Sequence, residues 1–179
     1  MSKIGKINIS IPEKVKVALS GNMMNVEGPF GKKTLPVDID NFDLIINEGK
    51  EISLKPKKID QNSKRLWGMN RSLINNAIIG ADKGYEKILE LVGVGFRAAM
   101  KGKQLNLQLG FSHDVNFDVP ESIKIVVEKQ TTIKITGIDK QEVGMIASKI
   151  KSLRPPEPYK GKGIKEKGQY ILRKEGKKK

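Results

Sequence analysis

The sequence predicts an α+β protein built from two duplicated small domains, each an antiparallel β-sheet with one helix packed on a face, plus a basic extended C-terminal tail. Three observations predict this fold. The two halves of the 179-residue chain align after a shift of 81 residues. Each half contains short segments of alternating polarity followed by one helix-like segment. Lysine, glycine and proline dominate the last 26 residues.

The repeat sets the predicted domain limits. At a shift of 81 residues the following pairs coincide: Gly21 with Gly102, Asn25 with Asn106, Val26 with Leu107, Phe30 with Phe111, Ile52 with Ile133 and Leu54 with Ile135. A further slip of two residues aligns residues 60–74 with 139–153. We therefore expect a first α+β domain over residues 1–81, a second over 82–153 and a tail over 154–179.

Each half begins with a predicted hairpin that turns at a glycine, over residues 15–31 and 96–112. In the second hairpin, Leu105, Leu107 and Leu109 alternate with polar residues, as a strand with one buried face requires. Further short strands, separated by turn-forming residues, are predicted over 43–48, 51–55, 122–128 and 131–137. We expect all of these strands to be antiparallel.

One helix closes each half. The second helix is predicted to start after Asp139, with Glu142 three residues further in a capping-box-like pattern, and to end at Pro155 and Pro156. Its apolar face is predicted to contain Val143, Ile146, Ile150 and Leu153.

The first helix shows a similar apolar stripe, and Gly80 is its predicted terminator. The stripe contains Leu66, Leu73, Ala77 and Ile78. Trp67 and Met69 are expected to pack in the core.

Positive charge is concentrated at the C-terminal end. Residues 149–179 hold twelve Lys or Arg against three Glu, whereas residues 82–148 hold nine basic and nine acidic side chains. Residues 1–81 hold thirteen basic against eight acidic side chains, and the whole chain has a net charge of +14. This distribution indicates a polyanion as partner, bound chiefly by the tail.

Composition argues against an enzyme. The chain has no cysteine, which excludes disulfides, thiolate catalysis and sulfur-based zinc sites. His113 is the sole histidine, and its neighbour Asp114 points to the opposite face of an extended strand, so the two cannot form a catalytic relay. We predict no catalytic residue, no metal site and no cofactor.

The N-terminus lacks the apolar centre of a secretory signal, and no apolar run approaches the roughly 18 residues that span a bilayer. We expect a soluble, intracellular protein.

Two glycine-containing segments resemble nucleotide loops only formally. Residues 93–98 fit a dinucleotide-binding pattern, but that pattern needs a helix where this chain continues into a predicted hairpin. Two interpretations remain for this segment: a bulge or close backbone approach, or glycines that admit an RNA phosphate next to Arg97. Residues 28–34 have the wrong spacing for a phosphate loop and are expected to form an exposed cationic turn.

The tail offers groups suited to RNA. The prolines between Pro155 and Pro158 favour extended geometry, which is expected to project the following residues away from the second helix. The run from Tyr159 to Gly163 then supplies an aromatic ring for base stacking, ammonium groups for phosphates and glycines that follow a groove. The alternative is a disordered, solubilising tail.

Several separated motifs carry a resemblance to a known family. They are residues 2–6, residues 67–76, residues 92–98, residues 109–113 and the run Pro156–Ile164. Together, in this order, they resemble the bacterial-type large-subunit ribosomal protein six family over nearly the whole chain. Two positions depart from the family pattern: Met69-Asn70 stand where small hydroxyl residues are usual, and Glu166 stands where an aromatic residue commonly follows the signature.

The resemblance implies a non-enzymatic structural constituent of the large ribosomal subunit. It implies binding to 23S ribosomal RNA near the base of the acidic stalk and the factor-binding region, with neighbouring large-subunit and stalk-base proteins as further partners. No membrane, small-molecule substrate or homo-oligomer is expected, and the location implied is cytoplasmic, in the ribosome. A general nucleic-acid-binding, nucleoid-like module is the alternative, although the sequence shows no recognition helix.

The expected RNA-binding residues come from the family motifs and from the charge of the tail. They are Gly93, Gly95, Arg97, Ser112, His113, Lys149, Lys151, Arg154, Tyr159, Lys160, Gly161, Lys162, Gly163, Lys165, Lys167, Arg173 and Lys174.

Overall fold

The computed structural model describes residues 2–47, 49–58 and 60–176 and divides the chain into two units. The first unit contains the chain up to Tyr85 together with Ile138–Lys140, and the second contains Glu86–Gly137 and the chain from Gln141 onward. Glu48, the last residue of one predicted strand, and residues 177–179 of the tail lie outside the described residues. The domain limits drawn from the repeat stay a sequence-based prediction.

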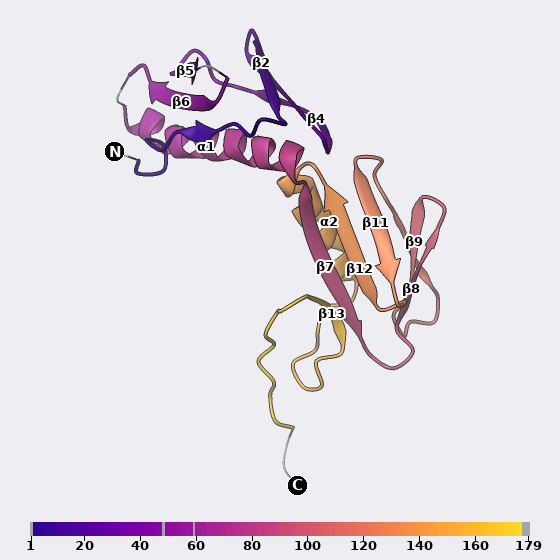
Figure 1. Cartoon of the computed structure of the whole chain (residues 1–179). Coiled ribbons are helices and arrows are strands. Elements are labelled where there is room, and N and C mark those ends of the chain that lie inside the picture. Colours follow the sequence, from indigo (N-terminus) through magenta and orange to yellow (C-terminus); the bar gives the residue numbers. More distant parts are fainter. Residues whose placement is uncertain (1, 48, 59, 177–179) are drawn as a thin grey trace. The chain divides into compact units, whose positions relative to one another are not determined.

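The first unit combines two three-stranded sheets with one long helix (Figure 1). Its elements are β1 (Ile9–Ser10), β2 (Lys16–Ser20), β3 (Met23–Gly28), β4 (Gly31–Pro36), β5 (Phe42–Asn47), β6 (Glu51–Pro56) and α1 (Gln61–Asp82). The sheet orders are β2-β3-β4 and β1-β6-β5, and every pair of neighbours within them is antiparallel. Helix α1 packs against β3, β4 and β6.

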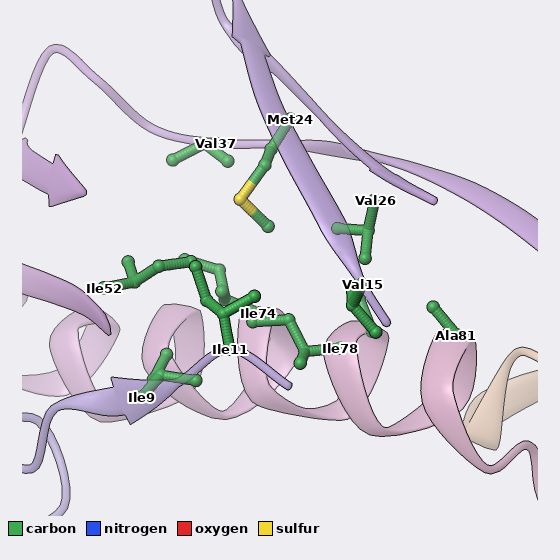
Figure 2. Close-up of a cluster of buried hydrophobic side chains, with 11 residues drawn as sticks. Ile9, Ile11, Val15, Met24, Val26, Val37, Ile52, Ile74, Ile78 and Ala81 are labelled. Atoms are coloured by element: carbon green, nitrogen blue, oxygen red, sulfur yellow. The ribbon is translucent and has the colours of Figure 1, made fainter. Parts of the chain in front are cut away.

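The core of the first unit lies between α1 and the strands (Figure 2). Met24 and Val26 alternate with less buried residues on β3 and are themselves fully buried, as the period-two pattern requires. Ile74 and Ile78 meet them from α1, because residues four apart lie on one face of a helix. A smaller cluster joins Phe42, Leu54 and Trp67.

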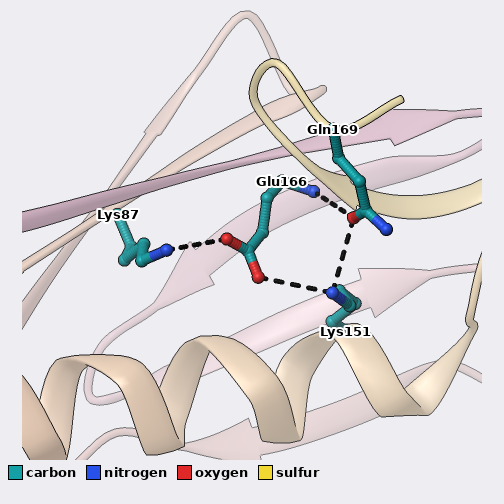
Figure 3. Close-up of polar contacts among 4 residues, drawn as sticks. All are labelled: Lys87, Lys151, Glu166 and Gln169. Atoms are coloured by element: carbon teal, nitrogen blue, oxygen red, sulfur yellow. Dashed lines mark hydrogen bonds and ion pairs between the residues drawn. The ribbon is translucent and has the colours of Figure 1, made fainter. Parts of the chain in front are cut away.

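The second unit carries a four-stranded sheet of order β11-β12-β7-β13 and a three-stranded sheet of order β10-β9-β8. Its elements are β7 (Tyr85–Val92), β8 (Arg97–Lys101), β9 (Gln104–Gln108), β10 (Val115–Asp118), β11 (Ile123–Glu128), β12 (Thr132–Gly137), α2 (Lys140–Leu153) and β13 (Gly163–Glu166). Helix α2 lies against one face of the four-stranded sheet (Figures 1 and 3). Its buried face includes Val143, Ile146 and Ile150, as predicted.

The structure confirms the predicted fold class and its internal repeat. Strands β8, β11 and β12 each lie 81 positions after β2, β5 and β6. Helix α2 begins 79 positions after α1, which is the predicted slip of two residues. Gly21 and Gly102 turn their hairpins with φ of 55° and 62°, a left-handed conformation that glycine adopts without strain. Each unit nevertheless has two sheets, where the sequence predicted one.

Three predictions for α1 are corrected. Met69 is 50% exposed and Leu73 is 44% exposed, so neither lies in the core. Ala77 and Ile78 of the predicted stripe are buried as expected, whereas Ile74 lies inward in place of Leu73. Trp67 is only 8% exposed, and its indole Nε1 donates a 2.7 Å hydrogen bond to the Leu54 carbonyl. The core role predicted for Trp67 is confirmed.

The end of α1 also differs from the prediction. The helix continues through Gly80 to Asp82, and Lys83 is its C-cap. Gly84 follows with φ of 71°, and its N–H donates to the Gly80 carbonyl at 3.0 Å. Gly84 therefore terminates the helix, because its left-handed backbone pairs one of the last free carbonyls.

The predicted projection of the tail away from the second helix is wrong for residues 163–166. These residues form β13, which pairs antiparallel with β7 from Gly163 opposite Val92 to Glu166 opposite Leu89. Ile164 is fully buried, and its N–H donates to the Arg154 carbonyl at 2.8 Å. The chain turns back after the prolines instead of projecting outward. Burial of Ile164 and the hydrogen bonds between β13 and β7 stabilise this arrangement.

Candidate nucleic-acid interface

Three separated segments of the second unit meet at one end of its four-stranded sheet. Strand β7 ends at Val92, and β13 begins opposite it at Gly163. Helix α2 ends at Leu153, and the next residue, Arg154, is tied to β13 through the Ile164 amide. We call this end of the unit the basic rim. It comprises the loop 93–97, the loop 110–113, Arg154 and the turn 155–162.

The first loop of the basic rim connects β7 to β8. Phe96 is 9% exposed, and its ring packs so closely on Gly93 that a Cβ there would lie 2.9 Å from it. Gly95 has φ of 78°, which favours glycine. The close approach is made by the Phe96 side chain at Gly93 alone, since nothing lies within 4 Å of a Cβ built on Gly95. Strand β8 follows where a nucleotide-binding motif needs a helix. Val94 is 92% exposed and Arg97 is also exposed, so the loop presents both side chains to solvent.

The second loop of the basic rim lies beside the first. A Cβ on Gly110 would lie 3.3 Å from the Phe96 ring, which places the end of β9 next to the loop 93–97. The Phe111 ring carries the Arg154 guanidinium, whose Cζ is 4.9 Å from the ring centroid. This cation–π contact fixes Arg154 without neutralising its charge. Ser112 and His113 are exposed directly beyond it.

The tail residues after Arg154 form a closed turn. The Glu157 N–H donates to the Lys162 carbonyl at 2.8 Å, and the Lys174 N–H donates to the Pro158 carbonyl at 2.8 Å. Tyr159 is 57% exposed at the tip, and Lys160 and Lys162 are exposed on either side of Gly161. An aromatic ring and two ammonium groups thus point outward from a backbone that is bonded to itself.

Glycine is required where this turn joins β13. Gly163 has φ of 141°, and a Cβ there would lie 2.6 Å from the Pro155 carbonyl oxygen and from Pro156 Cα. Gly163 and Gly161 are both buried. Their structural role is to let the turn fold onto the strand.

Glu166 joins the tail to the rest of the second unit (Figure 3). Its carboxylate accepts from Lys87 Nζ on β7 at 2.7 Å and from Lys151 Nζ on α2 at 3.3 Å. Gln169 Oε1 accepts from Lys151 Nζ at 3.4 Å and from the Glu166 N–H at 3.3 Å. The carboxylate is therefore bonded to a strand and a helix, and the backbone N–H of the same residue is bonded to Gln169 further along the tail.

The hydrogen bond from Lys87 is the main reason that the pKa of Glu166 lies below its usual value. Partial burial opposes this shift, and the hydrogen bond and charge of Lys151 add to it. Glu166 therefore remains ionised at neutral pH, and its ion pairs persist there.

The contribution of Glu166 to the order of the tail is expected to change with pH only in acid. A carboxyl group whose pKa is lower in the folded state stabilises that state above its unfolded pKa of about 4.3, and this contribution disappears as pH falls through the folded pKa. Ion pairs this exposed contribute on the order of 0.2–1 kcal/mol. Amide-exchange protection of Ile164 is therefore expected to be the same at pH 7 and pH 5.5 and to fall below pH 4 in the wild type. Glu166→Gln should have low protection throughout. A wild type and a variant with the same pH profile would contradict this expectation.

The predicted cations fall into two groups. Lys151 pairs with Glu166, and Lys165 pairs with Glu90 on β7 at 3.1 Å, so both neutralise carboxylates within the fold. The others have exposed side chains: Arg97, Lys149, Arg154, Lys160, Lys162, Lys167, Arg173 and Lys174. Among these, Lys149 lies on α2, the Lys167 N–H donates to the Ile88 carbonyl, and the Arg173 guanidinium lies near Gly161.

Sequence reasoning missed the residues that hold the tail in place. They are Lys87 and Glu90 on β7 and Gln169 beyond β13. The available signal was complementary charge, because Lys165 stands opposite Glu90 in the antiparallel register and Glu166 stands opposite Leu89, two residues from Lys87 on β7. Glu166 itself carries two of the ion pairs, with Lys87 and with Lys151.

The described residues contain neither a cluster of metal ligands nor a helix that could span a membrane. No cluster of three or more His, Cys, Asp or Glu side chains is arranged to hold a metal ion there. In the same part of the chain, no helix has the length and apolar character needed to cross a membrane.

The fold and the basic rim define a class of protein: an α+β scaffold that presents exposed cations beside an exposed tyrosine, the features of a nucleic-acid-binding protein. Comparison with known proteins identifies the family. The family model described as ribosomal protein L6 matches residues 92–167, which include the whole basic rim.

Full-length relatives agree with this match. Proteins named large ribosomal subunit protein uL6 are 48% identical in Beijerinckia indica subsp. indica and 50% identical in Caulobacter vibrioides, over 179 residues and the full length of both chains. The protein of the same name in Phenylobacterium zucineum is 49% identical over 181 aligned positions, again covering both chains completely. The chain belongs to the ribosomal protein L6 family.

Proposed function

We propose that the protein is a structural constituent of the large ribosomal subunit that binds and orders 23S ribosomal RNA. One observation carries this proposal: loops, a helix end and a tail turn from distant parts of the sequence converge on one exposed, cationic rim. The printed name of the full-length relatives supports placement in the large subunit. The role is non-enzymatic and is carried out in the cytoplasmic ribosome.

In the proposed mechanism, the charged side chains provide affinity for RNA, and the stacked base and the surface shape determine where on the RNA the protein binds. Arg97, Arg154, Lys160 and Lys162 neutralise phosphates and release counterions, so affinity falls with salt by roughly 0.7–0.9 logarithmic units per decade of salt for each contact. Tyr159 stacks on an unpaired base. The shape of the protein surface then selects the RNA site, because the segments of the basic rim are held in one geometry by backbone bonds and packing.

The proposed contact surface is wider than the rim itself. It adds the exposed cations Lys149, Lys167, Arg173 and Lys174, which lie on α2 and the tail. On the RNA, the site lies near the base of the acidic stalk and the factor-binding region, where the neighbours are stalk-base proteins. The protein acts as one copy and not as a homo-oligomer. The division into two duplicated domains and a tail serves this arrangement, with the second domain and the tail as the main binding parts.

Competition between two nucleic acids tests the proposal. Full-chain protein bound to 23S ribosomal RNA is titrated with unlabelled 23S RNA or with duplex DNA at equal salt. Structured RNA is expected to compete at least 100-fold better by phosphate-equivalent concentration, since a shape-selective site gains more than counterion release. Equal competition by duplex DNA would favour the nucleoid-like alternative and reject this function.

A further inference from the structure

We propose that Glu166 is a positioning residue, which holds the turn 155–162 in its RNA-binding form before RNA arrives. This inference rests on the proposed function, because it assigns the turn to RNA. The Glu166 carboxylate repels phosphate, yet in this role it favours the binding of RNA.

Glu166 anchors β13 to the rest of the second unit. Glu166 is the last residue of this strand and bridges Lys87 on β7 to Lys151 on α2 (Figure 3). The bridge fixes the strand against its sheet neighbour and against the helix that covers the sheet. The pair between Lys165 and Glu90 adds a second attachment along the same two strands.

Strand β13 in turn holds the turn 155–162 in place. Strand β13 begins at Gly163, and Gly163 packs on the backbone of Pro155 and Pro156 at the start of the turn. The Ile164 N–H holds Arg154, and the Lys162 carbonyl holds Glu157. Both ends of the turn are therefore held through Lys162, Gly163 and Ile164, which precede Glu166 in the sequence.

Holding the turn affects binding through the population of the competent form. The apparent dissociation constant equals the intrinsic constant divided by the fraction of molecules in that form. If loss of the Glu166 bridge reduces this fraction to about a fifth, the dissociation constant rises about fivefold. Simple charge counting predicts the opposite sign, because removing a carboxylate makes the protein more positive and strengthens attraction to phosphate.

The opposite signs allow a direct test with Glu166→Gln in the full chain. The matched control is Glu86→Gln, which also removes one carboxylate and one ion pair, the 3.0 Å pair between Glu86 and Lys134, on the same sheet. Binding to 23S ribosomal RNA and amide-exchange protection of Glu157, Ile164 and Lys174 are measured for both. We expect Glu166→Gln to bind about fivefold more weakly with amide protection largely lost, because a turn that is closed in only about a fifth of the molecules protects its amides very little, and Glu86→Gln to bind as tightly as wild type or slightly more tightly.

Further variants and outcomes decide the interpretation. Glu166→Asp keeps the charge and should restore part of both the protection and the affinity. Glu166→Gln that binds as tightly as Glu86→Gln, or that keeps full amide protection, overturns the positioning role. If the wild type itself shows no preference for 23S RNA, the proposed function fails. The amide protection of Glu166→Gln still decides whether Glu166 holds the turn: reduced protection supports this role and unchanged protection rejects it.

Discussion

Replacement of Tyr159, Lys160 and Lys162 together by alanine is expected to weaken binding of the full chain to 23S ribosomal RNA about 100-fold, since one stacked base is worth roughly 1–3 kcal/mol and two phosphate contacts are lost as well. All three side chains are exposed, and the turn is closed by backbone hydrogen bonds, so the fold should be unchanged. Binding measured over a range of salt should show a slope smaller by about 1.4–1.8, the share of two phosphates.

A matched control separates the turn from general positive charge. Lys101 on β8 and Lys124 on β11 are exposed lysines of the same unit, and β11 lies at the opposite edge of the sheet from β13. Their double replacement by alanine removes the same charge and should weaken binding by less than about fivefold through long-range electrostatics alone. A tenfold or greater loss from this control, or an unchanged salt slope for the turn variant, would show that the turn does not contact phosphates.

Replacement of Ile164 by alanine is expected to lower the free energy of unfolding of the second unit by about 2–5 kcal/mol, the usual cost of truncating a buried isoleucine. Ile164 is fully buried on β13 opposite Leu91. Urea denaturation followed by amide exchange, read separately for residues of the two units, measures the change. The first unit should keep its wild-type stability, because Ile164 belongs to the core of the second.

Val94→Ala is the control for this prediction. Val94 is a branched apolar residue of the same unit but is 92% exposed, so its loss should change stability by no more than about 0.5 kcal/mol. Equal effects of the two substitutions would mean that β13 is not packed in solution. For the same reason, removing residues 154–179 should not leave the second unit intact, because the removed segment includes one of its four sheet strands.

Much of the fold was predictable because the sequence contains the same order of elements twice. The hairpin glycines and the alternating strands recur at one spacing, and each copy supports the assignment of the other. The face of α1 was less predictable, since Leu73 and Ile74 are adjacent apolar residues and either could point inward. The indole of Trp67 decides between them by reaching the Leu54 carbonyl, a tertiary contact that helical periodicity does not contain.

The basic rim was predictable in composition and not in geometry. Charge counting found Arg154, Lys160 and Lys162, because net positive charge is a property of the sequence. It did not distinguish Lys151 and Lys165, whose charges are neutralised by Glu166 and Glu90 across strands distant in sequence. Nor did the prolines reveal that Gly163 brings the tail back, since that requires the close contact with Pro155 seen only in the folded chain.

Strand β13 has a further consequence for how the protein is synthesised. It occupies the outer side of β7, an eight-residue strand whose Leu89 and Leu91 are buried. An uncovered strand edge of this kind is a template for pairing with other chains. Because residues 163–166 emerge after every other element of the sheet, a nascent chain exposes that edge until this segment has been synthesised. Chains that terminate early, before this segment, are therefore the molecules of this protein most prone to aggregate.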